Sequence, residues 1–220
     1  MLQFFKKNLF IHKLIFKRYS ILRIMQVMEI KNLRLKGSII DVGSKKSLTN
    51  ISNFLNNEQI YYADKYSDNE KDIKIDLEKI MNNHHIKYDN LLLLNVLEHI
   101  FNYKNCLKNC HFLLKKNGNF YGSTPFLFRI HGSPSDFFRY TEEALIKILI
   151  DSDFKKIKVK VICGGLFITI YNIISMVTQK IPLLNNFLFI IFQFFDYVFG
   201  IISRNNKNTY PIGFFFEAKK

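Results

Sequence analysis

Polar residues follow a series of short apolar runs in the first half of this 220-residue chain. One run ends at Asp41 and is followed by Gly43, and a second ends at Asp64. Asp76 follows a third run, and Asn95 ends a fourth. The carboxyl ends of parallel strands meet at one edge of an open α/β sheet, which is where such a sheet binds its ligand. The spacing therefore predicts a binding site at that edge.

A second set of reactive side chains lies in a loop interrupted by Gly132 and Pro134. This loop contains His131, Asp136 and Arg139. A histidine with a pKa near neutrality can take a proton from a hydroxyl group. We therefore treat His131 and Asp136 as candidate catalytic residues. The alternative is that Asp136 and Arg139 only brace the loop by hydrogen bonds, which we prefer for Arg139.

The elements that must position these residues alternate between strand and helix, the pattern of a parallel α/β sheet. We expect strands over 38–42, 60–63, 73–75, 90–94, 119–123, 156–162 and 210–218. We expect helices over 48–55, 77–83, 103–114 and 142–150. Thr141 is a plausible N-cap for the last of these. At the Leu97-Glu98-His99 tract we expect a helix start, with Glu98 favoured by the helix dipole and His99 packing below the site.

Four regions follow from the composition. Residues 1–36 form a basic segment, in which 2–28 are expected to be one amphipathic helix. Residues 37–165 are the α/β body, 166–203 a strongly apolar helical region, and 204–220 a polar turn with a closing strand. Residues 183–202 are long enough to span a membrane, but Asp196 would be costly in lipid, so a buried or interfacial helix pair is favoured.

The net charge and the cysteines restrict the binding partners, the compartment and the metal-binding capacity that we expect. The formal net charge is +14, and residues 6–36 hold nine Lys or Arg against one acid, Glu29. Such a segment suits an anionic membrane surface or nucleic acid. Lysines interrupt the leading apolar run, so we expect no secretory signal peptide. The three cysteines lack the further ligands that a zinc site needs and suit a reducing compartment, so we expect no metal site and a cytoplasmic protein.

Several motifs together resemble the class I S-adenosylmethionine-dependent methyltransferases, in the type 11-like subgroup found with saccharide and cell-surface biosynthesis genes. The resemblance rests on 39–43, Asp64, the tract 90–100, the segment 113–121, the loop 131–141 and the closing strand 211–219. It implies a Rossmann-like, seven-stranded mixed sheet with helices on both faces and an apolar helical insertion before the last strand. It also implies S-adenosylmethionine as cofactor, with Asp64 at the ribose, Asp76 near the adenine, and Asp41, Gly43 and Asn95 in the same site.

One departure from the family pattern leaves alternatives open. The first turn keeps Gly43, but Lys45 and Ser47 stand where the family has further glycines. A non-catalytic binding or scaffold protein is therefore one alternative, and an RNA methyltransferase, suggested by the charge, is another. We favour methyl transfer to an oxygen of a saccharide or lipid-linked acceptor by a protein at the cytoplasmic face of the membrane. Nucleic acid is the less favoured partner, and the oligomeric state is left open.

Overall fold

The computed structural model describes residues 2–44, 54–55, 59–81, 85–132, 134–203 and 206–220, with side chains from residue 9 onward. The predicted helix over 48–55 lies almost wholly outside this part of the chain, as do Lys45 and Ser47 of the first turn. The described residues divide into two compact units. The helical unit comprises Met1–Glu29, Leu127–Arg129 and Val161–Gly213, and the sheet unit comprises Ile30–Phe126, Ile130–Lys160 and Phe214–Lys220.

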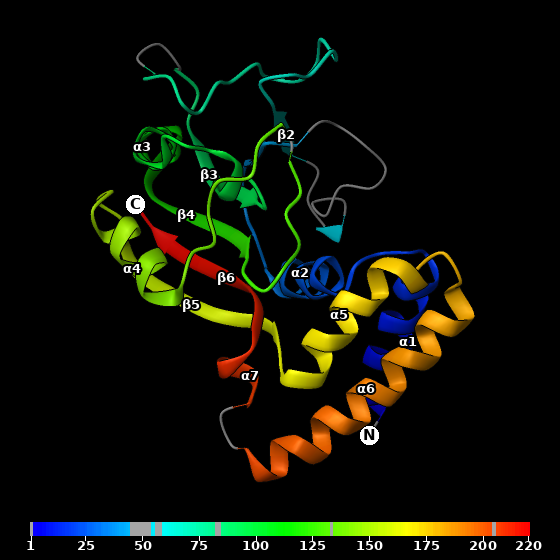
Figure 1. Cartoon of the computed structure of the whole chain (residues 1–220). Helices are drawn as coiled ribbons and strands as arrows, with labels where there is room; N and C mark the ends of the chain where they lie inside the picture. Colours follow the sequence, from blue (N-terminus) through cyan, green and yellow to red (C-terminus); the bar gives the residue numbers. More distant parts are fainter. Residues whose placement is uncertain (1, 45–53, 56–58, 82–84, 133, 204–205) are drawn as a thin grey trace. The chain divides into compact units, whose positions relative to one another are not determined.

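The sheet has six strands among the described residues, in the order β2-β1-β3-β4-β6-β5 (Figure 1). Their bounds are β1 Ile39–Val42, β2 Ile60–Ala63, β3 Tyr88–Leu94, β4 Leu114–Pro125, β5 Lys155–Gly164 and β6 Pro211–Lys219. β1 pairs in parallel with β2 and β3, and β3 pairs in parallel with β4. In Figure 1 the arrow of β6 runs against its neighbours, which makes the sheet mixed.

The third of the seven predicted strands, over 73–75, is reduced to a single parallel bridge between Ala63 and Ile73. The amide of Ile73 donates to the carbonyl of Tyr62, and its own carbonyl accepts from the amide of Asp64. Beyond this bridge the chain leaves the sheet, and Ile75 lines a cavity instead of continuing a strand. The prediction of seven strands is therefore corrected to six.

The helix predicted over 77–83 is also corrected, because residues 77–79 form a turn and a bend, 80–81 have no regular secondary structure, and the rest lies outside the described residues. The buried side chain of Asn109, on helix α3 (Tyr103–Leu113), explains the difference. Its amide group donates to the carbonyls of Leu77 and Lys79 at 2.9 and 2.7 Å, and its oxygen accepts from the amide of Met81. These bonds satisfy backbone groups that a helix would otherwise pair.

The helices α3 and α4 (Glu142–Ile150) of the sheet unit agree closely with the predictions, whereas β4 begins at Leu114, before its predicted start at residue 119. α3 ends one residue before its predicted end, and α4 has the predicted bounds. The hydroxyl of Thr141 accepts from the amide of Ala144, so Thr141 is the N-cap of α4. The core of the sheet is formed by fully buried apolar side chains from adjacent strands, among them Ile39, Ile40, Leu91, Leu92, Phe120, Phe215 and Phe216.

The helical unit contains α1 (Leu2–Phe16), α5 (Leu166–Thr178), α6 (Pro182–Ile202) and the short α7 (Asn206–Thr209), together with most of α2 (Ile21–Asn32). The single N-terminal helix predicted over 2–28 is thus two helices, separated where Arg18 has a φ of 64°. Because a non-glycine residue rarely adopts this φ inside a helix, the chain must break there. Both α1 and α5 pack on α6.

Asp196, the acid in the apolar region, has a structural partner inside the helical unit. One of its carboxylate oxygens accepts from the backbone amide of Phe167 at 3.0 Å and from the side-chain amide of Asn206 at 2.9 Å. It thereby caps the first turn of α5, where helix amides are otherwise unpaired. In the described part of the chain, α6 alone is long and apolar enough to cross a membrane, and only 11% of its most apolar window is buried.

Candidate active site

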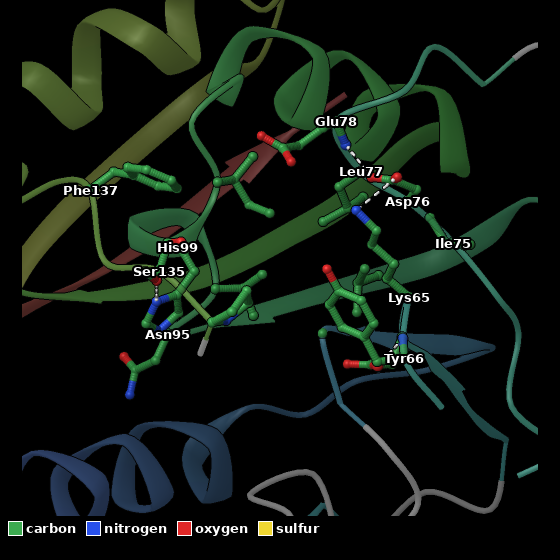
Figure 2. A pocket seen from close by; sticks show the side chains of 16 residues that line it. Lys65, Tyr66, Ile75, Asp76, Leu77, Glu78, Asn95, His99, Ser135 and Phe137 are labelled. Carbon is green, nitrogen blue, oxygen red and sulfur yellow. Dashed lines mark hydrogen bonds and ion pairs between the residues drawn. The ribbon is translucent and has the colours of Figure 1, made fainter. Parts of the chain in front are cut away.

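A cavity of about 690 Å³ lies in the sheet unit, at the carboxyl ends of β1, β2 and β3. Its volume is within the range of small-molecule sites, roughly 300–1,000 Å³. Lys65, Tyr66 and Asp76 lie on one side of it, and Asn95, His99, Ser135 and Phe137 lie on the other (Figure 2). The remaining lining residues are Val42, Gly43, Asp64, Ile75, Leu77, Glu78, Val96, Ile100 and Pro134.

The turn after β1 depends on Gly43. Its φ is +79°, a left-handed conformation that side chains rarely adopt, and its amide donates to the carbonyl of Ala63 at 2.7 Å. A Cβ atom on this residue would lie 2.4 Å from Cγ2 of Val96, which is impossible without movement. The glycine therefore lets the chain turn at the end of β1 while Val96 packs against its backbone.

Asp41 occupies a different place from its predicted one. It is buried at 1% exposure in β1, and it is not among the described residues that line the cavity. Its neighbours Val42 and Gly43 do line it. Asp41 therefore lies behind the cavity wall, and a direct contact with a ligand would need this wall to move.

Asp64 and Asp76 both line the cavity, as their positions in the sequence predict. The carboxylate of Asp64 accepts a hydrogen bond from the amide of Tyr66 at 2.6 Å, which uses one of its several acceptor positions. Asp76 accepts from the amide of Glu78 and forms an ion pair of 3.1 Å with Lys65. Partial burial alone would raise the pKa of Asp76, but the hydrogen bonds from Lys65 and Glu78 lower it overall.

Asn95 follows the last residue of β3 and has a φ of 54°. Asparagine is one of the few residues that adopt this backbone conformation, and strained residues of this kind gather at functional sites. Its amide donates to the carbonyl of Ser123 at 2.9 Å, and its side-chain oxygen accepts from the hydroxyl of Ser123 at 3.3 Å. The next strand thus holds Asn95 at the cavity.

The loop containing His131 docks on the 3-10 helix η2 (Leu97–His99). The amides of Phe137 and Phe138 donate to the carbonyl of Glu98, at 2.8 and 3.3 Å. Arg139 donates to a carboxylate oxygen of Asp136 at 2.7 Å and to the carbonyl of Phe138 at 2.8 Å. Arg139 therefore braces the loop. The same ion pair lowers the pKa of Asp136 far below its usual range, so that this carboxylate is a poor proton acceptor.

This docking brings together three side chains that are distant in the sequence: Glu98, His99 and His131. Oε1 of Glu98 lies 3.7 Å from Nε2 of His99 and 3.9 Å from Nε2 of His131. The two imidazole rings are 4.9 Å apart and nearly perpendicular. Burial raises the pKa of Glu98 to about 8, and its own backbone amide and the charge of Arg139 offset only part of that effect.

The helix start predicted at this tract is present as η2, with Glu98 in its first turn, but the helix dipole does not determine the environment of Glu98. η2 is only three residues long, too short to present an appreciable dipole, and the Glu98 side chain is completely buried beside the two histidines. His99 was expected to pack below the site, yet it lines the cavity. His131 does not line it but lies against His99. Lys65, which also lines the cavity, was not predicted, although its position directly after Asp64 was a signal for it.

Solved structures with a similar fold are S-adenosylmethionine-dependent methyltransferases. One from Archaeoglobus fulgidus has a TM-score of 0.52 and 15% identity, with 99% of each chain covered. The 1,6-didemethyltoxoflavin-N1-methyltransferase of Burkholderia thailandensis, crystallised with S-adenosylhomocysteine, has a TM-score of 0.54 and 12% identity over 91% of this chain and 79% of that one. This chain has the class I methyltransferase fold. No family model and no curated protein matches it.

A third similar structure is phosphoethanolamine N-methyltransferase 2 of Haemonchus contortus, bound to phosphomonomethylethanolamine and S-adenosylhomocysteine. Its TM-score is 0.53 and its identity 12%, over 90% of this chain and 52% of that one, so this chain spans about half the length of that enzyme. The structures of the Haemonchus contortus and Burkholderia thailandensis enzymes hold S-adenosylmethionine or S-adenosylhomocysteine, and the two enzymes are named for different substrates. The fold alone therefore does not identify an acceptor.

Proposed function

We propose that this protein is an S-adenosylmethionine-dependent methyltransferase. The observation that carries the proposal is the cavity at the carboxyl ends of β1 to β3, with Gly43 and Asp64 in its wall, on the class I methyltransferase fold. An open α/β sheet binds its ligand at this edge. The cavity volume also suits a nucleoside cofactor, and the glycine turn at Gly43 forms part of the cavity wall.

The residues present suggest how the cofactor would be held. The Asp64 carboxylate would accept hydrogen bonds from the ribose hydroxyls, since a carboxylate can accept from two neighbouring hydroxyl groups. The pair of Lys65 and Asp76 would border the adenine side, and Asn95 with the Gly43 turn would border the opposite end. When bound, the cofactor supplies an electrophilic methyl group on its sulfonium.

The acceptor would approach from the side formed by the loop of residues 130–141. Pro134, Ser135 and Phe137 of this loop line the cavity together with His99. This position supports the proposal that the loop selects the acceptor. We infer that the acceptor is a saccharide or a lipid-linked molecule and that one of its oxygen atoms receives the methyl group. His131 remains the candidate base. We assign Asp136 to holding His131 in place, because Asp136 donates no proton and accepts one poorly at its lowered pKa.

We also propose that the helical unit contacts the cytoplasmic face of a membrane. α6 exposes a row of large apolar side chains, among them Leu183, Phe187, Ile190, Phe194, Tyr197 and Ile201. Lys13, Lys17 and Arg18 near the end of α1 are exposed as well. Each basic side chain near an anionic surface contributes about 1 kcal/mol. Apolar contact adds an attraction that salt does not screen.

Two experiments test these proposals. Thermal unfolding followed with S-adenosylmethionine and with S-adenosylhomocysteine should show a rise in Tm with each, because a ligand that binds only the folded state stabilises it. Fractionation of cells should find the protein with membranes, released fully by alkaline carbonate and only in part by high salt. A protein that is wholly soluble at low salt would contradict the membrane proposal and weaken the case for a lipid-linked acceptor.

Non-catalytic binding remains the alternative function. The cyclase SpnF has the same fold, with a TM-score of 0.54 and 10% identity over 88% of this chain and 79% of that one. A methyltransferase-like fold can therefore serve another purpose. Transfer of a labelled methyl group from S-adenosylmethionine to a saccharide or lipid extract separates the two, since a scaffold would bind the cofactor without turnover.

A further inference from the structure

Three donor atoms converge beside the cavity: Oε1 of Glu98, Nε2 of His99 and Nε2 of His131. One ligand atom from each of these residues lies within 4.8 Å of those from the other two, and the residues stand on two segments that the Glu98 carbonyl joins through the amides of Phe137 and Phe138. One carboxylate oxygen and two imidazole nitrogens form a donor set that binds Zn²⁺, Fe²⁺, Co²⁺ and Mn²⁺ in proteins. His99 also lines the cavity, so these atoms lie next to the space available for a substrate.

The second nitrogen of each imidazole faces an acceptor. Nδ1 of His99 lies 2.5 Å from the carbonyl oxygen of Ser135, and Nδ1 of His131 lies 3.4 Å from Oδ2 of Asp136. A carbonyl or carboxylate oxygen can only accept, so Nδ1 carries the hydrogen in a neutral ring, and Nε2 keeps its lone pair. Metal-binding histidines are oriented in this way, by a carbonyl or carboxylate on the nitrogen that does not bind the metal.

The Glu98 carboxyl group supplies an independent sign of a ligand. It is fully buried, and neither oxygen has a hydrogen-bond partner in another residue of the described chain. An unpaired buried carboxylate is costly, and proteins rarely keep one without a counter-charge or a metal. The two nearest basic groups, His99 and His131, both present Nε2 to Oε1. A cation between these three atoms would neutralise the carboxylate.

We propose that Glu98, His99 and His131 bind one divalent transition-metal cation, with Zn²⁺ as the first candidate. Donor atoms about 2.1 Å from a tetrahedral Zn²⁺ lie roughly 3.4 Å from one another. The distances of 3.7 and 3.9 Å from Oε1 need only a small contraction to reach this value. The His131 side chain is 30% exposed, so it has room to rotate toward the cation.

The chemical consequence rests on the proposed methyl transfer. A cation at this site would have open positions for water or for a hydroxyl oxygen of the acceptor. It would lower the pKa of that hydroxyl, so that its proton leaves to solvent and the oxygen becomes nucleophilic near neutral pH. His131 would then be a metal ligand and no longer the base. The alternative arrangement is a metal-free cluster in which the carboxyl group of Glu98 is protonated.

The test uses the full chain, freed of metal with a chelator and then titrated with Co²⁺ and with Zn²⁺. Visible absorption reports Co²⁺ in a protein site, and calorimetry reports the Zn²⁺ stoichiometry. We expect one equivalent of either metal. His131→Ala should weaken binding more than tenfold, and Asp136→Asn, which alters only the support of a ligand, by about 10–100-fold. His85→Ala, at an exposed histidine, is the matched control and should bind like the wild type.

Two results would overturn the proposal: no saturable binding of either cation, or equal affinities in the His131→Ala and His85→Ala variants. Circular dichroism of each variant shows whether it is folded. Because His131 is partly exposed, its replacement is the variant least expected to disturb folding. Binding of S-adenosylhomocysteine by the metal-free protein is measured separately. A protein that binds the metal but not the nucleoside would keep the metal site and refute the proposed methyl transfer.

Discussion

Replacement of Gly43 by alanine tests the turn that shapes the cavity. The new Cβ would lie 2.4 Å from Cγ2 and 3.0 Å from Cγ1 of Val96, at a φ of +79°. The left-handed conformation costs about 1–2 kcal/mol for a residue with a side chain. Crowding in a packed region adds about 1–3 kcal/mol. The reduced freedom of the unfolded chain returns about 0.4–1 kcal/mol. We therefore expect a net loss of roughly 1–5 kcal/mol in the free energy of unfolding.

A double-mutant cycle separates the cost of crowding against Val96 from the cost of the left-handed backbone conformation. Val96→Ala removes both methyl groups that would crowd the new Cβ at position 43. The Cβ of residue 96 remains, 3.2 Å from that atom, which is only slightly shorter than an ordinary van der Waals contact. In this background Gly43→Ala should cost at least about 1 kcal/mol less than in the wild type. Urea unfolding of the four proteins measures the coupling. Equal costs in both backgrounds would show that Val96 does not pack on the turn, and no cost in either would refute the turn itself.

Three further predictions concern other parts of the chain. Asn109→Ala should lower the free energy of unfolding by about 1–3 kcal/mol, because the carbonyls of Leu77 and Lys79 lose their hydrogen-bond donor. Urea unfolding measures this loss, and an unchanged stability would contradict these two hydrogen bonds. Asp89→Asn should lower the free energy of unfolding at pH 7 by no more than about 1 kcal/mol, since the ion pair between Asp89 and Lys115 is exposed. Lys115 lowers the pKa of Asp89, so this difference should fade as acid protonates the folded carboxylate, and a constant difference from pH 7 to pH 2 would contradict it. Phe194→Ser, at a 61% exposed side chain of α6, should weaken sedimentation with anionic vesicles, whereas Ile80→Ser, 74% exposed in the sheet unit, should not.

The sheet could be predicted from local patterns. β1 to β3 contain short apolar runs that end at or are followed by a polar residue, and the Thr141 cap marks the start of α4. The third predicted strand failed because the pairing of Ile73 is limited to one bridge, which no local pattern reveals. The helix after Asp76 failed for a related reason. Its backbone groups are satisfied by Asn109, a residue of α3 about 30 positions away.

The part of the site that depends on strand positions could also be predicted from local patterns. Asp64 and Asn95 follow strands, and Asp76 follows the segment that is bridged to β2 at Ile73, so the fold brings all three to the cavity. The environment of Glu98 depends instead on a loop more than 30 residues later, which docks through backbone hydrogen bonds that carry no sequence signal. His131 was singled out for its loop, but its contact with Glu98 could not be inferred.

The apolar region shows the limits of composition. Its length and hydropathy predict helices, and both α5 and α6 form. In the sequence, Asp196 of α6 is an interruption of an apolar run. In the structure Asp196 caps α5, and a Cβ added to Gly165 would lie 2.0 Å from the Asp196 carboxylate. The two helices therefore meet closely at this point. The partner of this acid is a backbone amide, which sequence reasoning has no means of locating.

The central claim is that the cavity beside Asp64 binds the nucleoside cofactor. Isothermal titration calorimetry of the full chain with S-adenosylhomocysteine tests it most directly. We predict saturable binding at one site, weakened by about 1.5–3 kcal/mol in Asp64→Ala through the loss of charge-assisted hydrogen bonds. Asp68→Ala, at an exposed acid of the same segment, should bind like the wild type. No binding by the wild type, or equal affinities in the Asp64→Ala and Asp68→Ala variants, would contradict the assignment of the site.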